Sequence, residues 1–354
     1  MSLFLLLDGN SVAYRAFFAL PTDMATASGQ VTNAVYGFTS MLINLLKDHR
    51  PDRIAVTFDR PEPTFRHEMI SDYKAGRAET PDILRQQMGL VREVLSALRV
   101  ATVDESGWEA DDILATIATR AEADGHEVLI VTGDRDSYQL VHDPHVKVLY
   151  NRRGVSDYAL YDEAGIAEKT GVTPELYPQY AALRGDPSDN LDGVPGVGEK
   201  TAAKLINNYG GLDGIFANAD KQTPKLKASL IEHEARVRIN HALMVLRRDA
   251  PIEVDFTALN VDPNEPEVSR LFDFLEFRSL RARLDEALGA IGASALSSTA
   301  QSTAEVMEAE VLAIDDPAAA VAMIVALEML DIVPAWLGAP GRSDIDGIAI
   351  VGDR

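Results

Sequence analysis

The stretch that decides the fold is residues 108–112, Trp-Glu-Ala-Asp-Asp, together with residues 131–136, Val-Thr-Gly-Asp-Arg-Asp. The first opens an apolar helical run, and the second follows an apolar strand at 127–131. These two boundaries carry five carboxylates, which repel one another unless protons or cations compensate them. The carboxyl ends of parallel strands meet at one edge of a sheet, so both groups can converge there on one divalent-metal site.

Acids of the same kind recur elsewhere in the chain. Residues 3–7 form an apolar run that ends in Asp8, and residues 53–58 form another that ends in Asp59. A further acidic cluster, residues 184–190, holds Asp186 and Asp189. Acids in the first turn of a helix can also merely complement the helix dipole, and for one pair alone this explanation competes equally. The repetition favours a shared metal site.

Composition sets the outer limits. At 354 residues the chain can form one large or two ordinary domains with a real core. It has no Cys, which excludes disulfides and thiolate metal ligands and suits a reducing cytosol. The start shows no basic segment or cleavage site, so we expect no signal peptide. The apolar segment 321–333 contains Glu328 and Asp331 and is too short and too charged to span a bilayer. These features predict a cytoplasmic protein without a membrane partner.

The net charge of −22 at first argues against a nucleic-acid partner. However, residues 285–354 hold 12 Asp/Glu against 2 Lys/Arg, which is a balance of −10. In the remainder, bound metal ions would neutralise several of the clustered acids. A phosphate-binding surface can therefore be local.

Strands alternate with helices in the first half of the chain. Helices are predicted at 32–47 and 81–98 and a strand at 146–150, and from 162 onward the pattern is helical. This predicts an α/β fold, with a mostly parallel central sheet flanked by helices, and a separate helical subdomain. We expect an α/β metal-dependent core at 1–180, the helical subdomain at 181–288, an Ala/Ser/Thr/Gly-rich linker at 289–308 and a final segment at 309–354. That last segment, with a helix at 318–329 and strands at 332–336 and 345–351, is too short to bury its own core.

Residues 193–205 combine a Pro/Gly turn with the start of a helix. Gly196 and Gly198 would let backbone amides approach a phosphate. Lys200, Thr201 and Lys204 can add phosphate contacts. A simple helix cap and turn is the alternative, but it needs neither a second glycine nor the basic residues.

Taken in order, these motifs resemble the 5′ nuclease domains of the flap endonuclease family, as found in the bacterial DNA polymerase I class. The resemblance covers residues 3–288 and rests on residues 7–11, 57–59, 73–77, 109–112, 132–136, 185–190 and 195–198. It implies that one metal ion is held by Asp8, Asp59, Glu109 and Asp111. It implies that the second is held by Asp134, Asp136 and Asp186 with Asp111 shared, and that Asp112 and Asp189 bind through water.

The resemblance also assigns the irregular segment at about 60–80 to a helical arch that closes over the 5′ strand. In this sequence the segment follows Asp59 directly, so its basic residues are tethered beside the metals. Tyr73 can stack on an unpaired base, and Lys74, supported by Arg77, can offset charge at the attacked phosphate. Ordinary solvated charges on a loop are the alternative. The turn at 195–198 is implied to be a helix-hairpin-helix type DNA-binding motif, with K⁺ as a further ligand.

The final segment resembles the start of a 3′ exonuclease-like domain. The proofreading form of that domain has an Asp-x-Glu pair on its first strand, and residues 333–338 offer none. The expected segment therefore lacks the catalytic acid pair.

Phosphodiester hydrolysis needs an activated water and a stabilised leaving oxygen, and two divalent ions about 4 Å apart serve both. Oxygen ligands without Cys or clustered His favour Mg²⁺ or Mn²⁺, two or three ions in all. The sequence thus predicts a structure-specific 5′-3′ exonuclease or flap endonuclease acting by a two-metal mechanism, as in the removal of 5′ flaps and RNA primers in replication and repair. The expected partners of the monomer are DNA with a 5′ flap, nick or overhang and RNA primers on DNA.

Three other functions compete with this one. A haloacid-dehalogenase-type phosphatase would need a second acid two residues after Asp8, where Asn10 stands. A single-strand ribonuclease with a related acid-bearing sheet would not need the glycine turn. A non-catalytic DNA-binding module would need the turn but not nine carboxylates.

Overall fold

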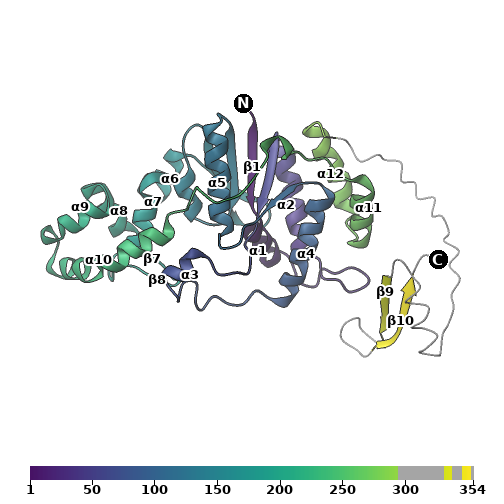
Figure 1. Cartoon of the computed structure of the whole chain (residues 1–354), viewed down its shortest axis with the longest axis horizontal. Coiled ribbons are helices and arrows are strands. Elements are labelled where there is room, and N and C mark those ends of the chain that lie inside the picture. The colour runs from purple at the N-terminus through teal and green to yellow at the C-terminus, as the bar shows by residue number, and fades with distance from the viewer. Residues whose placement is uncertain (294–330, 337–344, 352–354) are drawn as a thin grey trace. The chain divides into compact units, whose positions relative to one another are not determined.

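The computed structural model describes residues 1–293, 331–336 and 345–351. Its centre is a six-stranded sheet in the order β3-β2-β1-β4-β5-β6, in which only β6 runs antiparallel to its neighbour (Figure 1). The strands are β1 (Leu3–Asp8), β2 (Arg53–Thr57), β3 (Ala101–Val103), β4 (Glu127–Thr132), β5 (Val146–Arg153) and β6 (Asp157–Tyr161). The expected mostly parallel central sheet is confirmed.

Helices cover both faces of the sheet because its central strand is apolar on both sides. Along β1, Phe4 and Leu6 enter one core, and Leu5 and Leu7 enter the other. The second core is closed by α1 (Gly9–Ala19), α2 (Asn33–His49), α4 (Asp82–Ala97), α11 (Glu265–Phe274) and α12 (Arg278–Ala290). The first core is closed by α5 (Ala110–Ala123), with α6 (Glu163–Thr170) and α7 (Tyr177–Arg184) beyond it (Figure 1).

The helical part differs from its expected extent. Helices α8 (Glu199–Tyr209), α9 (Leu212–Ala217) and α10 (Pro224–Met244) extend away from the sheet with α7 (Figure 1). Helices α11 and α12 instead return to pack against α4 and α2, because their apolar residues, including Leu271 and Leu284, complete the second core. The expected subdomain at 181–288 is therefore wrong for these two helices.

Several elements were missed by the sequence patterns. They are α1, the short strand β3, the antiparallel strand β6 and the short helix α3 (Phe65–Met69) inside the segment 60–80. The expected helices at 32–47 and 81–98 are confirmed. No helix in the described part of the chain is long and apolar enough to cross a membrane.

The chain divides into two compact units, and the sheet and all twelve described α-helices belong to the first, Met1–Met24 with Thr32–Leu296. In the other unit the two strands expected near the end are confirmed as β9 (Asp331–Trp336) and β10 (Ile345–Val351), which pair antiparallel. The helix expected at 318–329 and most of the linker expected at 289–308 lie outside the described residues.

Candidate active site

The acids gather where the strand order reverses, between β1 and β4. The chain passes from β1 outward to β3 on one side and from β4 outward on the other, which leaves a crevice at the carboxyl ends of the two central strands. Asp8 ends β1 in this crevice and is 5% exposed. Its carboxylate accepts hydrogen bonds from the amide of Ser11 and the hydroxyl of Thr132, both at 2.9 Å. Asp8 therefore caps α1 and links the ends of β1 and β4.

The turn after β4 is built to present Asp134 and Asp136. The amide of Asp134 donates to the Thr132 hydroxyl (3.0 Å), and the amide of Asp136 donates to Asp134 Oδ1 (2.8 Å). Gly133 donates its amide to Ser11 Oγ at 2.8 Å, and a Cβ at this glycine would lie 2.9 Å from Arg15 Nε. A side chain at this position would therefore force the Arg15 and Ser11 side chains to move.

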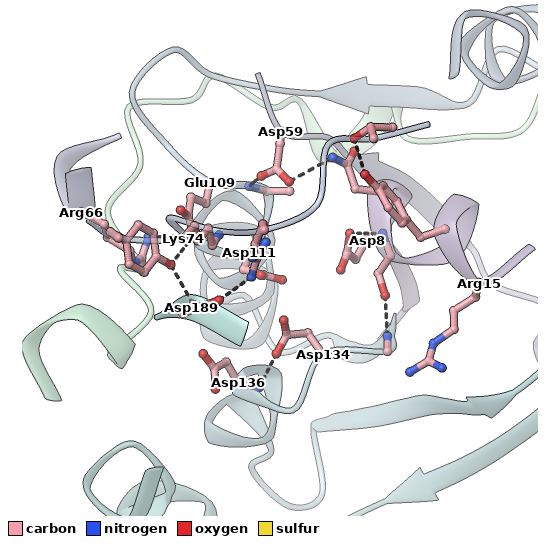
Figure 2. A pocket seen from close by; sticks show the side chains of 18 of the residues that line it. Asp8, Arg15, Asp59, Arg66, Lys74, Glu109, Asp111, Asp134, Asp136 and Asp189 are labelled. Carbon is pink, nitrogen blue, oxygen red and sulfur yellow. Dashed lines mark hydrogen bonds and ion pairs between the residues drawn. The ribbon is translucent and has the colours of Figure 1, made fainter. Parts of the chain in front are cut away.

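The third contribution comes from the start of α5. Asp59, after β2, receives the amide of Ala110 at 2.8 Å and the side-chain amide of Asn10 at 3.0 Å. Asp111 lies at the centre of the labelled acids in Figure 2, and its Oδ1 is buried without a hydrogen-bond partner. Such an unpaired buried oxygen is costly unless a cation or proton meets it.

Burial and mutual repulsion make these acids hold protons. Burial raises the pKa of Asp8 to about 7, and the charges of Asp59 and Asp134 contribute to the rise. The pKa of Asp111 is also raised, first by burial and then by Asp8, Asp134 and Asp59. Burial likewise raises the pKa values of Asp59, Asp134 and Asp136. A set of carboxylates in this state favours any bound cation that replaces the protons.

Seven of the nine expected ligands line one cavity of about 800 Å³: Asp8, Asp59, Glu109, Asp111, Asp134, Asp136 and Asp189. They surround the cavity. Within the described residues, no three of them lie close enough together to hold a metal ion as they stand. All of these ligands are oxygen donors. The buried Asp111 Oδ1, which has no hydrogen-bond partner, would be stabilised by a cation. The residues present therefore fit hard divalent cations.

Asp112 has a structural partner. It is fully buried and receives Arg66 through both guanidinium NH groups, at 2.5 and 2.8 Å. The amide of Arg247 donates to the same carboxylate at 2.9 Å. Asp112 does not line the cavity, and the expectation that it binds metal through water stays a prediction.

Asp186 also lies outside the cavity lining. Its Oδ1 accepts the amide of Ser188 at 2.8 Å and the Ser188 hydroxyl at 2.5 Å, which caps a short 3-10 turn. The other oxygen lies 3.8 Å from Arg184. A ligand role for this residue stays a prediction.

The segment at 60–80 is anchored at its base by Arg66, which is 1% exposed and donates to the Leu243 carbonyl at 2.7 Å. Further along, Lys74 Nζ lies 2.9 Å from Glu109 Oε2 (Figure 2). Arg77 pairs with Asp189 and donates to the Ser188 carbonyl at 2.9 Å. The expected cations thus do lie beside the acids.

Tyr73 is buried in this structure. Its ring is 5% exposed, and its hydroxyl donates to Asp189 at 3.0 Å and to Glu109 at 3.3 Å. Hydrogen bonds to two acids hold the ring inside in this arrangement, with Lys74 Nζ 5.0 Å from its centroid. Stacking on a base would require the ring to leave these partners, and it stays a prediction.

Sequence patterns missed Arg15, which lines the cavity from α1 and forms no ion pair among the described residues. Its spacing from Asp8 could have revealed it. Seven residues are about two turns of a helix, so Arg15 lies on the same helix face as Asp8. This spacing could not be used because α1 itself was not recognised. Asn10 and Ser11 were missed as partners of the acids for the same reason, and Thr132 because its contact with Asp8 spans 124 positions of the chain.

The turn at 193–198 is tight and open to solvent on its outer side. A Cβ at Gly193 would lie 2.3 Å from the Arg184 carbonyl, whereas a Cβ at Gly198 would meet nothing within 4 Å. Gly196 has φ +86°. Gly198 precedes the first residue of α8, so the free amides of that helix, with Lys200, Thr201 and Lys204 on its first two turns, border an accessible surface.

Comparison with known proteins now identifies the family. Residues 3–171 match the 5′-3′ exonuclease N-terminal resolvase-like domain, and residues 172–267 match the 5′-3′ exonuclease C-terminal SAM fold. The chain belongs to the 5′-3′ exonuclease family. This 5′-3′ exonuclease chain is 51% identical over 290 residues to DNA polymerase I of Mycobacterium leprae, a match that covers 81% of the chain and 32% of the relative. The match to DNA polymerase I of Bacillus subtilis is 41% over 283 residues, covering 79% and 32%.

The chain therefore spans about a third of the length of the curated relatives it matches. Among solved structures, this 5′-3′ exonuclease chain resembles the bacteriophage T5 flap endonuclease, described as a pseudo-enzyme-product complex with DNA and metal ions. The TM-score is 0.58 at 20% identity, covering 80% of this chain and 99% of that one. The catalytic core of Rad2 in complex with DNA substrate gives 0.54 at 18%, covering 81% and 92%. At these identities the likeness shows the fold.

Proposed function

We propose that this chain is a divalent-metal-dependent, structure-specific 5′-3′ exonuclease and flap endonuclease. The observation that carries the proposal is the unpaired, buried Asp111 Oδ1 at the centre of acids whose pKa values are raised. Only bound cations would make these ionised acids stable together at neutral pH. The family to which the chain belongs and the printed descriptions of its structural neighbours, with DNA and metal ions, support the same proposal.

Two divalent ions, held by the acids of the 800 Å³ cavity, would supply an activated water and stabilise the attacked and leaving oxygens. The protein's own residues do the remaining work. Asp111, at the centre of the acids, would help to hold both ions. Lys74, beside Glu109, is within reach of a phosphate in the cavity and would offset its developing charge. Arg77 holds the segment that carries Lys74 against Asp189.

The expected substrates are DNA with a 5′ flap, nick or overhang and RNA primers on DNA. Duplex would rest on the turn at 193–198, where exposed amides and the nearby Lys200 and Lys204 can bind phosphates. The strand to be cut would enter the acidic cavity beneath the segment 60–80. We propose Mg²⁺ or Mn²⁺ as the metal because the cavity's acidic ligands are all hard oxygen donors.

The experiment that tests the proposal is Asp111→Asn, which keeps the shape and removes the central charge. We expect single-turnover cleavage of a 5′-flapped DNA in Mg²⁺ to be abolished, whereas flap binding in Ca²⁺ changes little. Asp189→Asn should have a milder effect, because Asp189 is already paired with Arg77 and Tyr73. Substantial turnover by Asp111→Asn would contradict the two-metal assignment. Preferred cleavage of unpaired RNA over the flap would favour the ribonuclease alternative.

A further inference from the structure

A second, smaller cavity has a volume of about 90 Å³. It is lined by the cations Arg135, Lys169 and Arg184 and by one acid, Glu199. Arg135 stands between Asp134 and Asp136 in the chain, and Arg184 also borders the hollow at the turn at 193–198. The cavity lining is thus connected to both regions that the proposed function assigns to DNA.

The three cations are only partly neutralised. Glu199 lies 3.4 Å from Arg135 and 3.6 Å from Arg184, but its side chain is 63% exposed. Asp186 lies 3.8 Å from Arg184, whose own side chain is 16% exposed. One exposed carboxylate and one distant one leave a net positive charge around a small, partly enclosed space, and such a space attracts an anion.

A buried hydroxyl lines the same space without a partner. Tyr177 is 1% exposed, and its hydroxyl makes no hydrogen bond. Burial and then the charge of Asp136 raise the pKa of this phenol, while the neighbouring Arg184 and Arg135 act to lower it, so the two guanidinium groups and the Asp136 carboxylate all lie within electrostatic range of it. A buried O–H without an acceptor costs free energy, and an oxyanion in the cavity would supply the acceptor.

We propose that this cavity binds one phosphate group, with Arg135, Lys169 and Arg184 as its counter-charges and the Tyr177 hydroxyl as a donor. Its volume of about 90 Å³ leaves room for a small anion such as phosphate. The proposed function enters only in the identity of this phosphate, which we take to be a backbone phosphate of DNA bound near the turn and the metal site. Free phosphate is the other source of the same chemistry.

The first test uses inorganic phosphate and the full chain in EDTA at low salt, followed by calorimetric titration. Without metal the acidic cavity repels phosphate, so binding reports the basic cavity. We expect saturable binding at one site, weakened roughly tenfold by Tyr177→Phe, as for the loss of a hydrogen bond to a charged group. Lys169→Ala, at an exposed position, should weaken it as well.

The matched control is Tyr158→Phe, because the Tyr158 hydroxyl is also buried without a partner but lies on β6, outside this cavity. It should leave phosphate binding unchanged. Tyr177→Phe should not lower the melting temperature, since it removes a group that has no protein partner. No saturable binding by the unaltered chain, or equal binding by Tyr177→Phe, would overturn the proposal.

The second test identifies the source. Flapped duplex DNA is titrated in Ca²⁺ at several salt concentrations, and Lys169→Ala should reduce the slope of log K against log salt by about one. A reduced slope assigns the site to a backbone phosphate. Weakened phosphate binding with an unchanged slope would overturn the DNA source and leave a site for free phosphate. Loss of cleavage is not used, so failure here and failure of the proposed nuclease function are separable.

Discussion

The acids and the cations of the active site are held in different ways. Asp8, Asp59 and Asp134 follow buried strands of the sheet, and their positions are fixed by backbone amides and the Thr132 hydroxyl. Lys74 and Arg77 come from an irregular segment, and their partners are the acids themselves. One set is therefore placed by the fold, and the other is placed by charge.

Because of this difference, the two cations occupy acids that metal ions would also bind. Lys74 lies on Glu109, and Arg77 lies on Asp189. Metal binding at these acids would weaken both ion pairs and release the cations toward a phosphate. Arg66 differs from them: it lies 3.4 Å from Glu109, but its closest partner is Asp112, which lies outside the cavity lining. The segment thus has a fixed base and an adjustable upper part.

The largest expected effect breaks the fixed base. Arg66→Ala would leave Asp112 buried and without its partner, and breaking a buried ion pair from one side costs about 3–5 kcal/mol. Urea unfolding should show a loss of this size. The double variant Arg66→Met with Asp112→Leu should recover most of it, because it removes both charges of the pair and Glu109 keeps Lys74 as its partner. A single-variant loss below about 1 kcal/mol would mean that the base is not fixed by this pair.

The next effect concerns the adjustable part. Lys74→Ala should cut the single-turnover rate roughly a hundredfold, the scale of a lost electrostatic stabiliser, while duplex binding barely moves. Arg60→Ala is the matched control, since Arg60 belongs to the same segment but pairs with Glu62 and Asp104. Near-normal rates for both variants would reduce the segment to a passive surface loop.

The pH dependence of stability sharpens the account of the acids. The folded-state pKa of Asp8, about 7, lies above its ordinary value of 3.8, so the folded chain binds this proton more tightly than the unfolded chain does. The contribution of Asp8 is complete below about pH 4 and is lost as pH rises through about 7.

In EDTA we therefore expect the melting temperature to fall between about pH 5 and pH 8, with a flatter profile for Asp8→Asn. Mg²⁺ should raise the melting temperature more at the upper end, because the ionised acids bind it. Identical profiles for the unaltered chain and Asp8→Asn would show that Asp8 does not carry this proton.

The smallest expected effect lies at the turn. Gly198→Val should weaken duplex binding, because the added side chain would stand in the way of a phosphate. It should not destabilise the chain, because a Cβ at this position contacts no protein atom within 4 Å. Lys200→Ala should lower the salt slope by about one. Single-turnover cleavage at saturating substrate should remain near normal for both. A large loss of that rate at unchanged affinity would contradict the binding role of the turn.

The sequence predicted the parts of the site that repeat a local pattern. Apolar strands ending in Asp8 and Asp59 were readable because burial and polarity change abruptly there. Helix α1 could not be predicted, because Gly9 and the polar residues at its start obscure the helical spacing of its apolar residues. Arg15, which lies on this helix, was therefore missed as a site residue. The contacts of Asp112 and Tyr73 were not readable either. They depend on partners far away in the chain, Arg66 and Asp189, and no local spacing encodes such pairings.

The hydrogen bond from Thr132 to Asp8 joins residues 124 positions apart and has a consequence for how the chain is made. During synthesis from the amino terminus, β1 and β2 emerge first, but the central edge of β1 stays open until β4 appears. Pairing over such a separation forms slowly, since a long loop must close before the contact contributes. A nascent chain that ends before β4 would therefore contain Asp8 without its partner Thr132. The acids of β1 and β4 would come together only in a late step, when β4 pairs with β1.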